Sequence, residues 1–344
     1  MEKREIGRTG LAVTKMGFGG VGLGQRVGVI SEAQANATLS AAFASGIEYF
    51  DTSPWYGHCL SEHRTGHVLR TRPRDGYVLS TKVGRLFFRP ENPDKFETEV
   101  WERGLPFDYR FDYTADGVRR SYEDSLHRLG LNRIDLLYVH DLDDRLDKGD
   151  ANGLEIGGVD GAIEQLDKGG GWQVLADMRA CGEIRGIGFG INYTGLIPRF
   201  LERFDPDMFL IAMPYTLMDQ DALEEELPLC EEKGISVVIG SVFSSGIVAT
   251  GTAAKPVYGY KPPSDAVVAK LNGIEAVCAR HDVPVRAAAL QFPLFHPAVA
   301  SIIPGAMAPD HVTGNAALLD RPIPSDFWAE LKAEGLLHAE APTG

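Results

Sequence analysis

The sequence has few of the features that mark disulfide-stabilised, membrane-spanning or secreted proteins. Its 344 residues include only four cysteines, and none of them forms a CxxC pair, so neither a disulfide framework nor a redox motif is expected. No run of about 18 apolar residues, the length that crosses a bilayer, occurs in the chain. The opening MEKREIGRTG is charged and lacks the apolar segment of a signal peptide. These absences together favour a protein of the reducing cytoplasm.

Positive charge is also scarce. The chain has 34 Lys and Arg against 48 Asp and Glu, a net charge of -14. An acidic surface repels phosphate backbones and anionic lipids, so neither nucleic acid nor a membrane is an expected partner. No set of His, Asp and Cys has the spacing of metal ligands, so no bound metal is expected. With 44% hydrophobic and 24% charged residues, the composition is that of a globular protein with a large core.

Short apolar runs alternate with helix-like segments along most of the chain. Strands are predicted at residues 15–19, 47–51, 77–82, 134–139, 184–190, 208–213, 236–240 and 301–303. Helices are predicted at residues 31–45, 114–129, 223–233, 265–281 and 309–319. Such alternation indicates a parallel sheet, and eight strands close a barrel. The sequence therefore predicts an α/β fold, a (β/α)8 TIM barrel forming a single domain over residues 1–344. A doubly wound open sheet is the alternative.

Signals at the helix ends support these boundaries. Ser31 followed by Gln34 has the spacing of a capping box. Gly46 and Gly234 follow predicted helices, where a left-handed residue commonly ends a helix.

Several segments fall outside the strand–helix alternation. Residues 1–12 are predicted to form a β-hairpin ahead of the first barrel strand. Long connections at residues 84–113, 141–170 and 246–264 follow the third, fourth and seventh predicted strands. Loops that follow barrel strands rise at the C-terminal mouth, where active sites lie, so we expect functional lids there.

Ionisable residues stand at the ends of three consecutive predicted strands. Asp51 closes IEYFD, Lys82 closes VLSTK, and His140 follows IDLLYV. In a barrel these three side chains would meet at one mouth. Tyr56 lies five residues beyond Asp51, in the turn TSPWYG, and can fold back over them.

This set of side chains is suited to proton transfer. A phenol, with a reference pKa of about 10, is a poor acid or base near neutrality, but a neighbouring ammonium favours the phenolate. Asp51 would hold Lys82 charged, and His140 could orient a substrate oxygen while Tyr56 gives or takes the proton. Each residue alone is more often structural. All four at matching strand ends favour a catalytic site.

The segments that carry these residues resemble the aldo/keto reductase family. The matching segments cover nearly the whole chain: GRTGLAVTKMGFGG, FDTSPWYGHCLSEHRTGHVLR, VLSTKVGR, GVRRSYEDSLHRLGLNRIDLLYVHD and ALQFPLFHPAVASIIPGA. The resemblance implies a (β/α)8 barrel that transfers hydride between a nicotinamide cofactor and a small carbonyl or lactol. It also implies roles for the four residues. Tyr56 would be the general acid/base, Lys82 its modulator, Asp51 the orienting carboxylate and His140 the ligand of the substrate oxygen.

Three segments point to one branch of the family. GLPFDYRFDYTADGV, SVFSSGI and ALQFPLFHP resemble the L-fucose or D-threo-aldose 1-dehydrogenases and the pyridoxal 4-dehydrogenases. This likeness implies NAD-linked oxidation of an aldose lactol to the lactone. A pyridoxal 4-dehydrogenase and a generic aldehyde or ketone reductase are the alternatives. A non-catalytic regulatory subunit that binds the cofactor is a third, which the complete set of four residues opposes. Trp55, Tyr56 and His140 are expected to contact the substrate, and Trp101 and Phe107 are further candidates.

The resemblance also implies where a dinucleotide would bind across the barrel mouth. The loop after the seventh strand would hold the diphosphate, because small residues and hydroxyls let backbone N–H groups approach phosphate. An ordinary polar turn is the alternative reading of this loop. The expected cofactor contacts are Gly20, Val21, Asp51, Asn192, Tyr215, Ser241, Phe243, Ser244, Ser245, Gly246, Gly305, His311 and Asn315.

The choice between NAD and NADP depends on cationic side chains. NADP-using relatives often carry Lys or Arg where Gly305 and His311 stand here. A 2′-phosphate needs such donors, so NAD is the expected cofactor. A charged His311 leaves NADP as the alternative. Two further departures concern the nicotinamide: Ala212 replaces a common Gln, and Gly240 or Ser241 an aromatic residue. Tyr215 and Phe243 are the candidates to compensate.

Two other patterns resemble known ligand-binding motifs but are interpreted differently. GFGGVG satisfies the GxGxxG spacing of Rossmann folds, but no helix starts within it, and the first predicted helix waits until Ser31. These glycines are interpreted as the mouth of the first strand, leaving clearance for a cofactor at Gly20 and Val21. The acidic segment at residues 141–155 lacks the spacing of an EF-hand loop and is interpreted as a solvated lid.

Overall fold

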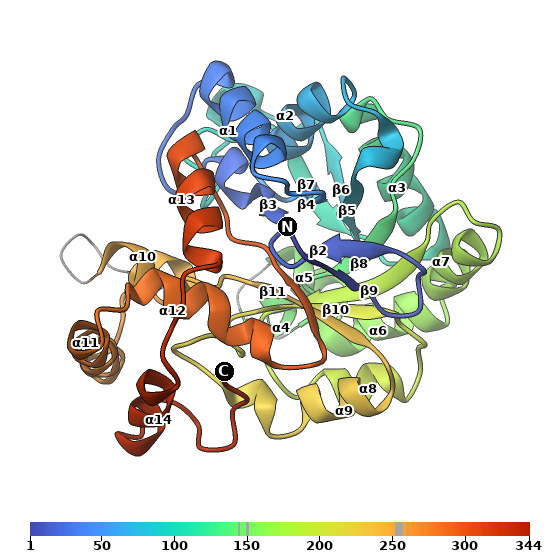
Figure 1. Ribbon diagram of the computed structural model, residues 1–344. Coiled ribbons are helices and arrows are strands. Elements are labelled where there is room, and N and C mark those ends of the chain that lie inside the picture. The colour runs from blue at the N-terminus through green and yellow to red at the C-terminus, as the bar shows by residue number, and fades with distance from the viewer. Residues whose placement is uncertain (144, 149–150, 252–256, 260) are drawn as a thin grey trace.

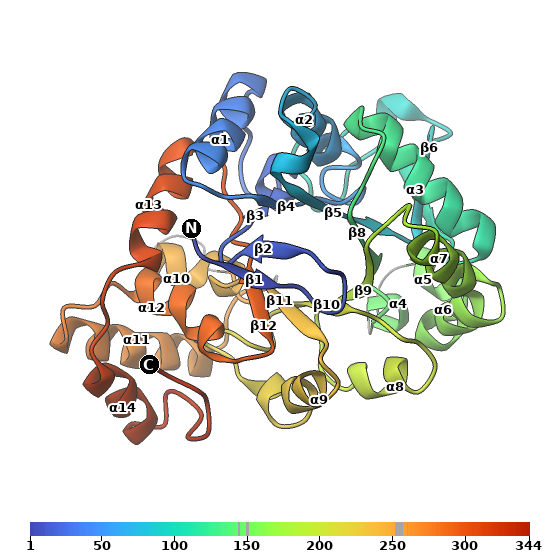
Figure 2. The same ribbon diagram turned by 45° about the vertical axis from the view of Figure 1, so that its right-hand side comes forward.

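Eight parallel strands form the centre of the molecule in the computed structural model (Figures 1 and 2). They are β3 (Phe18–Gly19), β4 (Tyr49–Asp51), β5 (Val78–Val83), β8 (Leu136–His140), β9 (Gly186–Ile191), β10 (Met208–Ala212), β11 (Ser236–Gly240) and β12 (Val299–Ile302). Parallel bridges Met16–Ile302 and Gly19–Gly305 join the first strand segment to the last. The barrel predicted from the sequence is therefore confirmed. The open-sheet alternative was wrong, because the two outer strands pair with each other.

Helices surround this sheet, as Figure 1 shows. The structure describes residues 1–143, 145–148, 151–251, 257–259 and 261–344. Their helices are α1 (Glu32–Ala44), α2 (Leu60–Leu69), α3 (Ala115–Leu129), α4 (Arg145–Lys148), α5 (Ala151–Glu155), α6 (Gly158–Asp167), α7 (Gly171–Ala180), α8 (Ile197–Leu201), α9 (Glu226–Glu232), α10 (Ile247–Thr250), α11 (Asp265–Arg280), α12 (Val285–Gln291), α13 (Pro309–Leu319) and α14 (Ser325–Ala333). Among these described residues, no helix has both the length and the apolarity needed to cross a membrane.

The structure confirms the predicted helix ends at Ser31, Gly46 and Gly234, but the side chain of Gln34 has a different partner from the one expected. Ser31 Oγ accepts a hydrogen bond from Gln34 N at 3.1 Å, as a helix cap should. Gln34 does not complete the capping box, because its side chain donates to Met307 O at 2.8 Å instead. Gly46 and Gly234 both have left-handed φ angles, 76° and 64°. The side chain of Gln34 thus ties α1 to the loop after β12.

The predicted N-terminal hairpin is confirmed and closes the bottom of the barrel. It consists of β1 (Lys3–Glu5) and β2 (Ala12–Thr14), which pair antiparallel and lie across the ring of strands in Figure 2. Ile6 and Val13 pack in one buried cluster with barrel residues such as Leu136 and Met208. The hairpin therefore covers this end of the barrel interior with apolar side chains.

The connection between β5 and α3, expected to be a long loop, contains a second hairpin. Its strands are β6 (Arg85–Phe88) and β7 (Asp108–Phe111), paired so that Arg85 faces Phe111. The four-residue strands are too short to give a clear alternating pattern in sequence. Gly84 permits the turn from β5 into β6 because its φ is 111° and a Cβ there would lie 2.2 Å from the Tyr113 ring. The hairpin brings Arg85 back toward the barrel mouth.

Within the described residues, the other two long connections contain helices rather than strands. The connection at residues 141–170 contains α4, α5 and α6. The connection at residues 246–264 contains α10. Residues 144 and 149–150 of the acidic segment, and residues 252–256 and 260, lie outside the described residues.

Hydroxyl groups inside the barrel form a chain that leads to Asp51. Ser80 Oγ donates to Asp51 Oδ1 at 2.7 Å, and Tyr49 Oη lies 3.1 Å from Ser80 Oγ. Tyr138 Oη lies 3.2 Å from Tyr49 Oη. Because the serine proton is committed to the carboxylate, Tyr49 must donate to Ser80, and Tyr138 to Tyr49. Every donor in the chain therefore points toward Asp51, and burial raises the pKa of both tyrosines, which keeps them neutral.

On the outer face of the sheet, a buried carboxylate joins α2 and α3 to β5. Glu62, in α2, is fully buried. Thr81 Oγ1 donates to its Oε1 at 2.6 Å, and Arg128 Nε, in α3, donates to Oε2. The neighbour of Thr81 in β5 is Lys82, so this ion pair fixes the helices beside the strand that carries the lysine.

We expect Glu62→Gln to lower the free energy of unfolding by about 3–5 kcal/mol, because it leaves Arg128, whose side chain is only 14% exposed, without this counter-ion. Urea denaturation followed by circular dichroism measures the change. The control is Glu183→Gln, which breaks the half-exposed Arg119–Glu183 pair at 2.7 Å and should cost less than about 1 kcal/mol. Equal losses in the two variants would contradict the role given to Glu62.

Candidate active site

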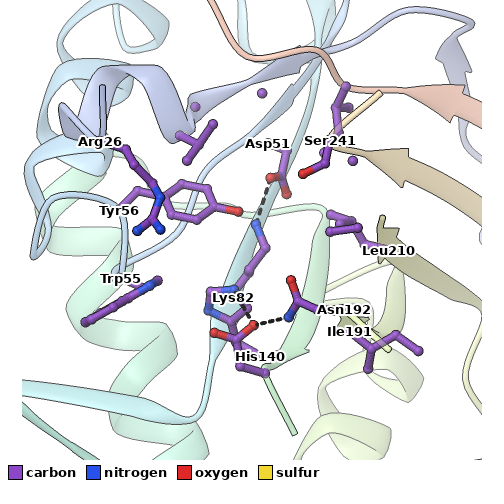
Figure 3. A pocket seen from close by; sticks show the side chains of 18 of the residues that line it. Arg26, Asp51, Trp55, Tyr56, Lys82, His140, Ile191, Asn192, Leu210 and Ser241 are labelled. Carbon is purple, nitrogen blue, oxygen red and sulfur yellow. Dashed lines mark hydrogen bonds and ion pairs between the residues drawn. The ribbon is translucent and has the colours of Figure 1, made fainter. Parts of the chain in front are cut away.

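The structure brings Asp51, Tyr56, Lys82 and His140 together at the barrel mouth, as the sequence predicted (Figure 3). Lys82 Nζ donates to Asp51 Oδ2 at 2.7 Å and to Thr52 O at 2.9 Å. The ammonium lies 4.6 Å from the centre of the Tyr56 ring. That ring stands edge-on to the imidazole of His140, with 6.0 Å between centroids. Figure 3 shows the tyrosine hydroxyl pointing toward the ion pair.

Strand register explains why three of these residues meet. In the parallel ladder, Asp51 is paired with Ser80, Lys82 with Tyr138, and His140 with Gly190. Lys82 therefore lies two residues beyond the partner of Asp51, and His140 lies two residues beyond the partner of Lys82. An offset of two residues keeps all three side chains on the same face of the sheet.

Tyr56 reaches the mouth through a tight turn. Its N–H donates to Ser53 O at 3.1 Å. The turn packs directly against the first loop, where a Cβ at Gly24 would lie 2.6 Å from the carbonyl carbon of Tyr56. Gly57 allows the same close approach from the other side, with a φ of 68°.

The Asp51–Lys82 ion pair is enclosed by protein. Both side chains are only 1% exposed. Burial raises the pKa of Asp51, and the neighbouring Lys82 and the hydrogen bond from Ser80 oppose that rise. Separating the pair would leave a charge buried without a partner, so the ammonium is held beneath the phenol ring.

His140 is held by four neighbouring side chains. Its Nδ1 lies 3.1 Å from Arg85 Nη1 and 3.2 Å from Ser53 Oγ. Its Nε2 lies 3.6 Å from Asp141 Oδ1, and Tyr113 Oη donates to its carbonyl oxygen at 2.8 Å. The imidazole is thus fixed in position and orientation at the wall of the pocket.

The pocket above these residues has an aromatic side and a small-residue side. Trp55 and Trp101 pack edge to face at 5.8 Å and line it together with Tyr56 and Arg26. The full lining comprises Gly19, Gly20, Val21, Arg26, Asp51, Trp55, Tyr56, Lys82, Trp101, His140, Asp141, Gly190, Ile191, Asn192, Leu210, Ala212, Gly240, Ser241 and Ile303. Phe107, a candidate from the sequence, does not line it and is 37% exposed.

Five of the expected cofactor residues line this pocket: Gly20, Val21, Asp51, Asn192 and Ser241. Asn192 Nδ2 donates to Asp141 Oδ1 at 3.0 Å and to Asp143 Oδ2 at 2.7 Å. Figure 3 shows the amide oxygen of Asn192 directed into the pocket. Ala212 and Gly240, paired across β10 and β11, also line the pocket and leave room for a planar ring. This side of the pocket is therefore lined by small side chains and one amide group.

The other expected cofactor residues do not line this pocket: Tyr215, Phe243, Ser244, Ser245, Gly246, Gly305, His311 and Asn315. Tyr215 is fully buried and packs against the rings of Phe292 and His296. The position of Tyr215 therefore gives no support to the prediction that its ring contacts the nicotinamide in place of the missing Gln and aromatic residue. Gly305 pairs with Gly19, and a Cβ there would lie 3.0 Å from Val21.

The loop after β11 has an unusual backbone. Ser241, Ser244 and Ser245 have positive φ angles of 52°, 50° and 62°, and Gly246 has a φ of 104°. Non-glycine residues rarely adopt this conformation, and such strain concentrates at ligand-binding segments. Ser244 Oγ lies 3.1 Å from Thr216 Oγ1, which ties the loop to the one after β10.

A cation that the sequence reasoning missed lies between this loop and α13. Arg286, in α12, donates to Asn315 Oδ1 at 2.6 Å, and its guanidinium carbon lies 5.7 Å from the centre of the Phe243 ring. His311 is exposed. The segment PVRAAALQ gave no signal for Arg286, because a single arginine in a helix is ordinary. Arg26 and Asp141, which line the pocket, were likewise not singled out.

Beside the pocket, His58 stands in a box of aromatic rings. The rings of Trp55, Phe87, Phe96 and Tyr109 lie 5.1–6.0 Å from it. Its Nδ1 donates to Phe107 O, while its Nε2 has no hydrogen-bond partner among the described residues. Burial, reinforced by Arg85, lowers the pKa of His58. The neutral imidazole therefore supports the Trp55 wall of the pocket.

Comparison with known proteins gives concordant matches. A model of the aldo/keto reductase family matches residues 15–334. The chain is 40% identical over 344 residues to the pyridoxal 4-dehydrogenase of Microbacterium luteolum, with 98% of each chain covered. It is 38% identical over 334 residues to the D-threo-aldose 1-dehydrogenase of a Pseudomonas species, covering 95% of this chain and 96% of that one. The holo form of an aldo-keto reductase from Bacillus halodurans superposes with a TM-score of 0.73 at 25% identity, covering 99% and 98% of the two chains.

We expect acid to weaken the fold through His58. Its pKa is lower in the folded state than the ordinary 6.5, so the folded chain binds fewer protons than the unfolded chain. The contribution of His58 to stability is therefore present above pH 6.5 and is lost as the pH falls toward the folded value. The free energy of unfolding in urea, measured from about pH 5 to pH 7, should rise more steeply with pH in the wild type than in His58→Gln. Replacing the exposed His67 by Gln should preserve the wild-type slope; equal slopes for wild type and His58→Gln would refute the assignment.

Proposed function

This chain belongs to the aldo/keto reductase family, and we propose that it oxidises a cyclic hemiacetal to the lactone with NAD. It is an NAD(P)-dependent oxidoreductase. The observation that carries the proposed chemistry is the buried Asp51–Lys82 ion pair, which lies beneath the Tyr56 ring and opposite the His140 imidazole.

The substrate class follows from what two relatives are named for. One is a pyridoxal 4-dehydrogenase and the other a D-threo-aldose 1-dehydrogenase. Aldoses and pyridoxal share one feature, an aldehyde that a hydroxyl of the same molecule can close into a cyclic hemiacetal. We propose an aldose lactol of the L-fucose or D-threo-aldose type as the substrate. Pyridoxal is the second candidate, favoured by the Trp55 and Trp101 wall.

The residues of the pocket divide the proton chemistry between them. The hemiacetal hydroxyl would bind between Tyr56 and His140, where the imidazole orients its oxygen. Tyr56 takes the hydroxyl proton as the C–H bond breaks and the carbonyl of the lactone forms. Lys82 Nζ stabilises the phenolate that precedes this transfer, and Asp51 keeps Nζ charged and in place. A nicotinamide ring, when bound, supplies the acceptor for the hydride. The complete set of four residues opposes the non-catalytic regulatory alternative.

The assignment of NAD rests on the residues near the adenosine end. Gly305 has no side chain to meet a 2′-phosphate, and His311 accepts a hydrogen bond at Nδ1 from Met307 N at 3.4 Å. Arg286 is already engaged with Asn315 and Phe243. We further propose that Gly246 and its neighbouring serines bind the diphosphate through their N–H groups. As to compartment, we propose the cytoplasm, which suits four cysteines that form no disulfide.

The test of this function is the initial rate of NAD and NADP reduction with a panel of substrates: L-fucose, D-arabinose, L-xylose, D-galactose, pyridoxal and a simple alcohol. We expect NAD to be reduced with one stereochemical group of sugars and the alcohol to be inert. A methyl glycoside of the best sugar is the control, because it lacks the anomeric hydroxyl and should give no rate. Activity on pyridoxal alone would transfer the function to the second candidate. Faster reduction of NADP would overturn the cofactor assignment, and an inert panel would overturn the function.

We expect Tyr56→Phe to reduce kcat by about 10²–10⁴-fold, because the variant loses its proton acceptor. Fluorescence titration should show unchanged affinity for NAD. Tyr193→Phe, in an exposed residue outside the pocket lining, is the matched control and should turn over like the wild type. Turnover of Tyr56→Phe within about tenfold of the wild type would refute the role of Tyr56.

A further inference from the structure

Arg85 lies buried behind His140. Its side chain is 4% exposed, and it is not among the residues that line the pocket. The guanidinium carbon lies 4.8 Å from the centre of the Trp55 ring, 4.5 Å from that of Phe111 and 5.6 Å from that of Tyr109. These rings restrict how the guanidinium can turn. The side chain is therefore held by packing as well as by its charge.

The hydrogen bonds of Arg85 determine where the proton of His140 resides. Arg85 Nη1 lies 3.1 Å from His140 Nδ1. A guanidinium can only donate, so Nδ1 must accept and carries a lone pair. A second neighbour of Nδ1 is Ser53 Oγ at 3.2 Å, which already accepts from Trp55 N at 3.1 Å and is suited to donate its own proton. Both neighbours of Nδ1 therefore place the ring proton on Nε2.

Without Arg85, the charges around the imidazole would not favour a neutral ring with its proton on Nε2. Lys82 approaches from β5, and Tyr56 faces the ring edge from the turn after β4. Asp141 Oδ1 lies only 3.6 Å from Nε2, and a carboxylate so close favours the doubly protonated imidazolium. Arg85 Nη2 donates to Asp141 Oδ2 at 2.9 Å and thereby neutralises that carboxylate.

Asp141 is itself fixed in the orientation that this arrangement needs. Its backbone adopts a left-handed φ of 48°, and its Oδ1 accepts from Asn192 Nδ2 at 3.0 Å. One guanidinium thus contacts both the imidazole and the carboxylate beside it.

We propose that Arg85 is a positioning residue that holds His140 as the neutral tautomer with its proton on Nε2. In that form His140 donates a hydrogen bond to the substrate oxygen, whereas the Nδ1–H tautomer would present a lone pair to it. The proposal rests on the function proposed above only for the identity of that oxygen. The tautomer and its dependence on Arg85 are properties of the protein alone.

The direct test is nitrogen-15 NMR of the protein labelled at its histidines, without substrate. The His140 signals are assigned by their loss in His140→Gln. We expect the wild type to show His140 protonated at Nε2, and Arg85→Met to show a mixture of tautomers or the imidazolium. An Nδ1–H tautomer in the wild type, or an unchanged tautomer in Arg85→Met, would overturn the proposal.

Turnover gives the second test. We expect Arg85→Met to lower kcat by at least about tenfold with the affinity for NAD unchanged. In a His140→Ala background the same substitution should change kcat by less than about threefold, because its target is gone. A loss of the same size in both backgrounds would show that Arg85 does not act through His140.

Two further variants separate positioning from folding. Arg85→Lys keeps the positive charge but cannot span both contacts, so it should fold with the wild-type Tm and still lose kcat. Arg74→Met removes a comparable ion pair, with Asp135 at 2.6 Å, at the opposite end of the barrel. It should lower Tm and leave kcat and the His140 tautomer unchanged. If no hemiacetal is oxidised but the tautomer depends on Arg85, only the proposed function fails.

Discussion

The buried ion pair between Asp51 and Lys82 is the interaction on which the site depends. Two charges without solvent are stable only when each has the other and both have further hydrogen bonds. The barrel supplies these: Thr52 O accepts from the lysine, and the chain from Tyr138 through Tyr49 and Ser80 donates to the aspartate. On the outer side of the same strand, Thr81 joins β5 to Glu62 and through it to Arg128. The same hydrogen bonds and ion pairs therefore stabilise the barrel and hold Lys82 Nζ beneath the Tyr56 ring.

A second charged group, Arg85 with Asp141, stands behind His140 in the same way that Asp51 stands behind Lys82. In each case a buried, charged side chain holds another side chain that faces the pocket. Asp51 holds Lys82, and Arg85 holds His140. The two pairs differ in what they hold. Asp51 holds Lys82 Nζ in place through an ion pair, whereas Arg85 assigns a proton to one nitrogen of a neutral ring. Both effects are strong because the paired side chains are buried, and electrostatic interactions between buried groups are weakly screened.

Sequence reasoning missed a hairpin and two arginines, and it predicted a cofactor contact at Tyr215 that the position of this residue does not support. The hairpin of β6 and β7 was read as a loop because four-residue strands carry too little alternation to register. Tyr215 was offered as a nicotinamide contact because its position in the chain follows a strand end, yet its ring turns inward onto Phe292 and His296. Arg85 and Arg286 were passed over because an arginine in a segment of mixed composition is ordinary. The hairpin was missed because of the length of its strands, whereas the cases of Tyr215, Arg85 and Arg286 concern the direction of a side chain, which depends on neighbours distant in the sequence.

The sequence by itself determined the barrel, the hairpin at its base and the four residues at its mouth. Every predicted strand overlaps an observed one, because hydrophobic periodicity and helix caps are local properties. Asp51, Lys82 and His140 could be grouped because strand ends in a parallel barrel share one edge. Only the tertiary structure decided which groups stand behind them. The contacts of Arg85 with His140 and of Arg286 with Asn315 join residues 55 and 29 positions apart, and no periodic pattern encodes a contact made by a single pair of side chains across separate elements.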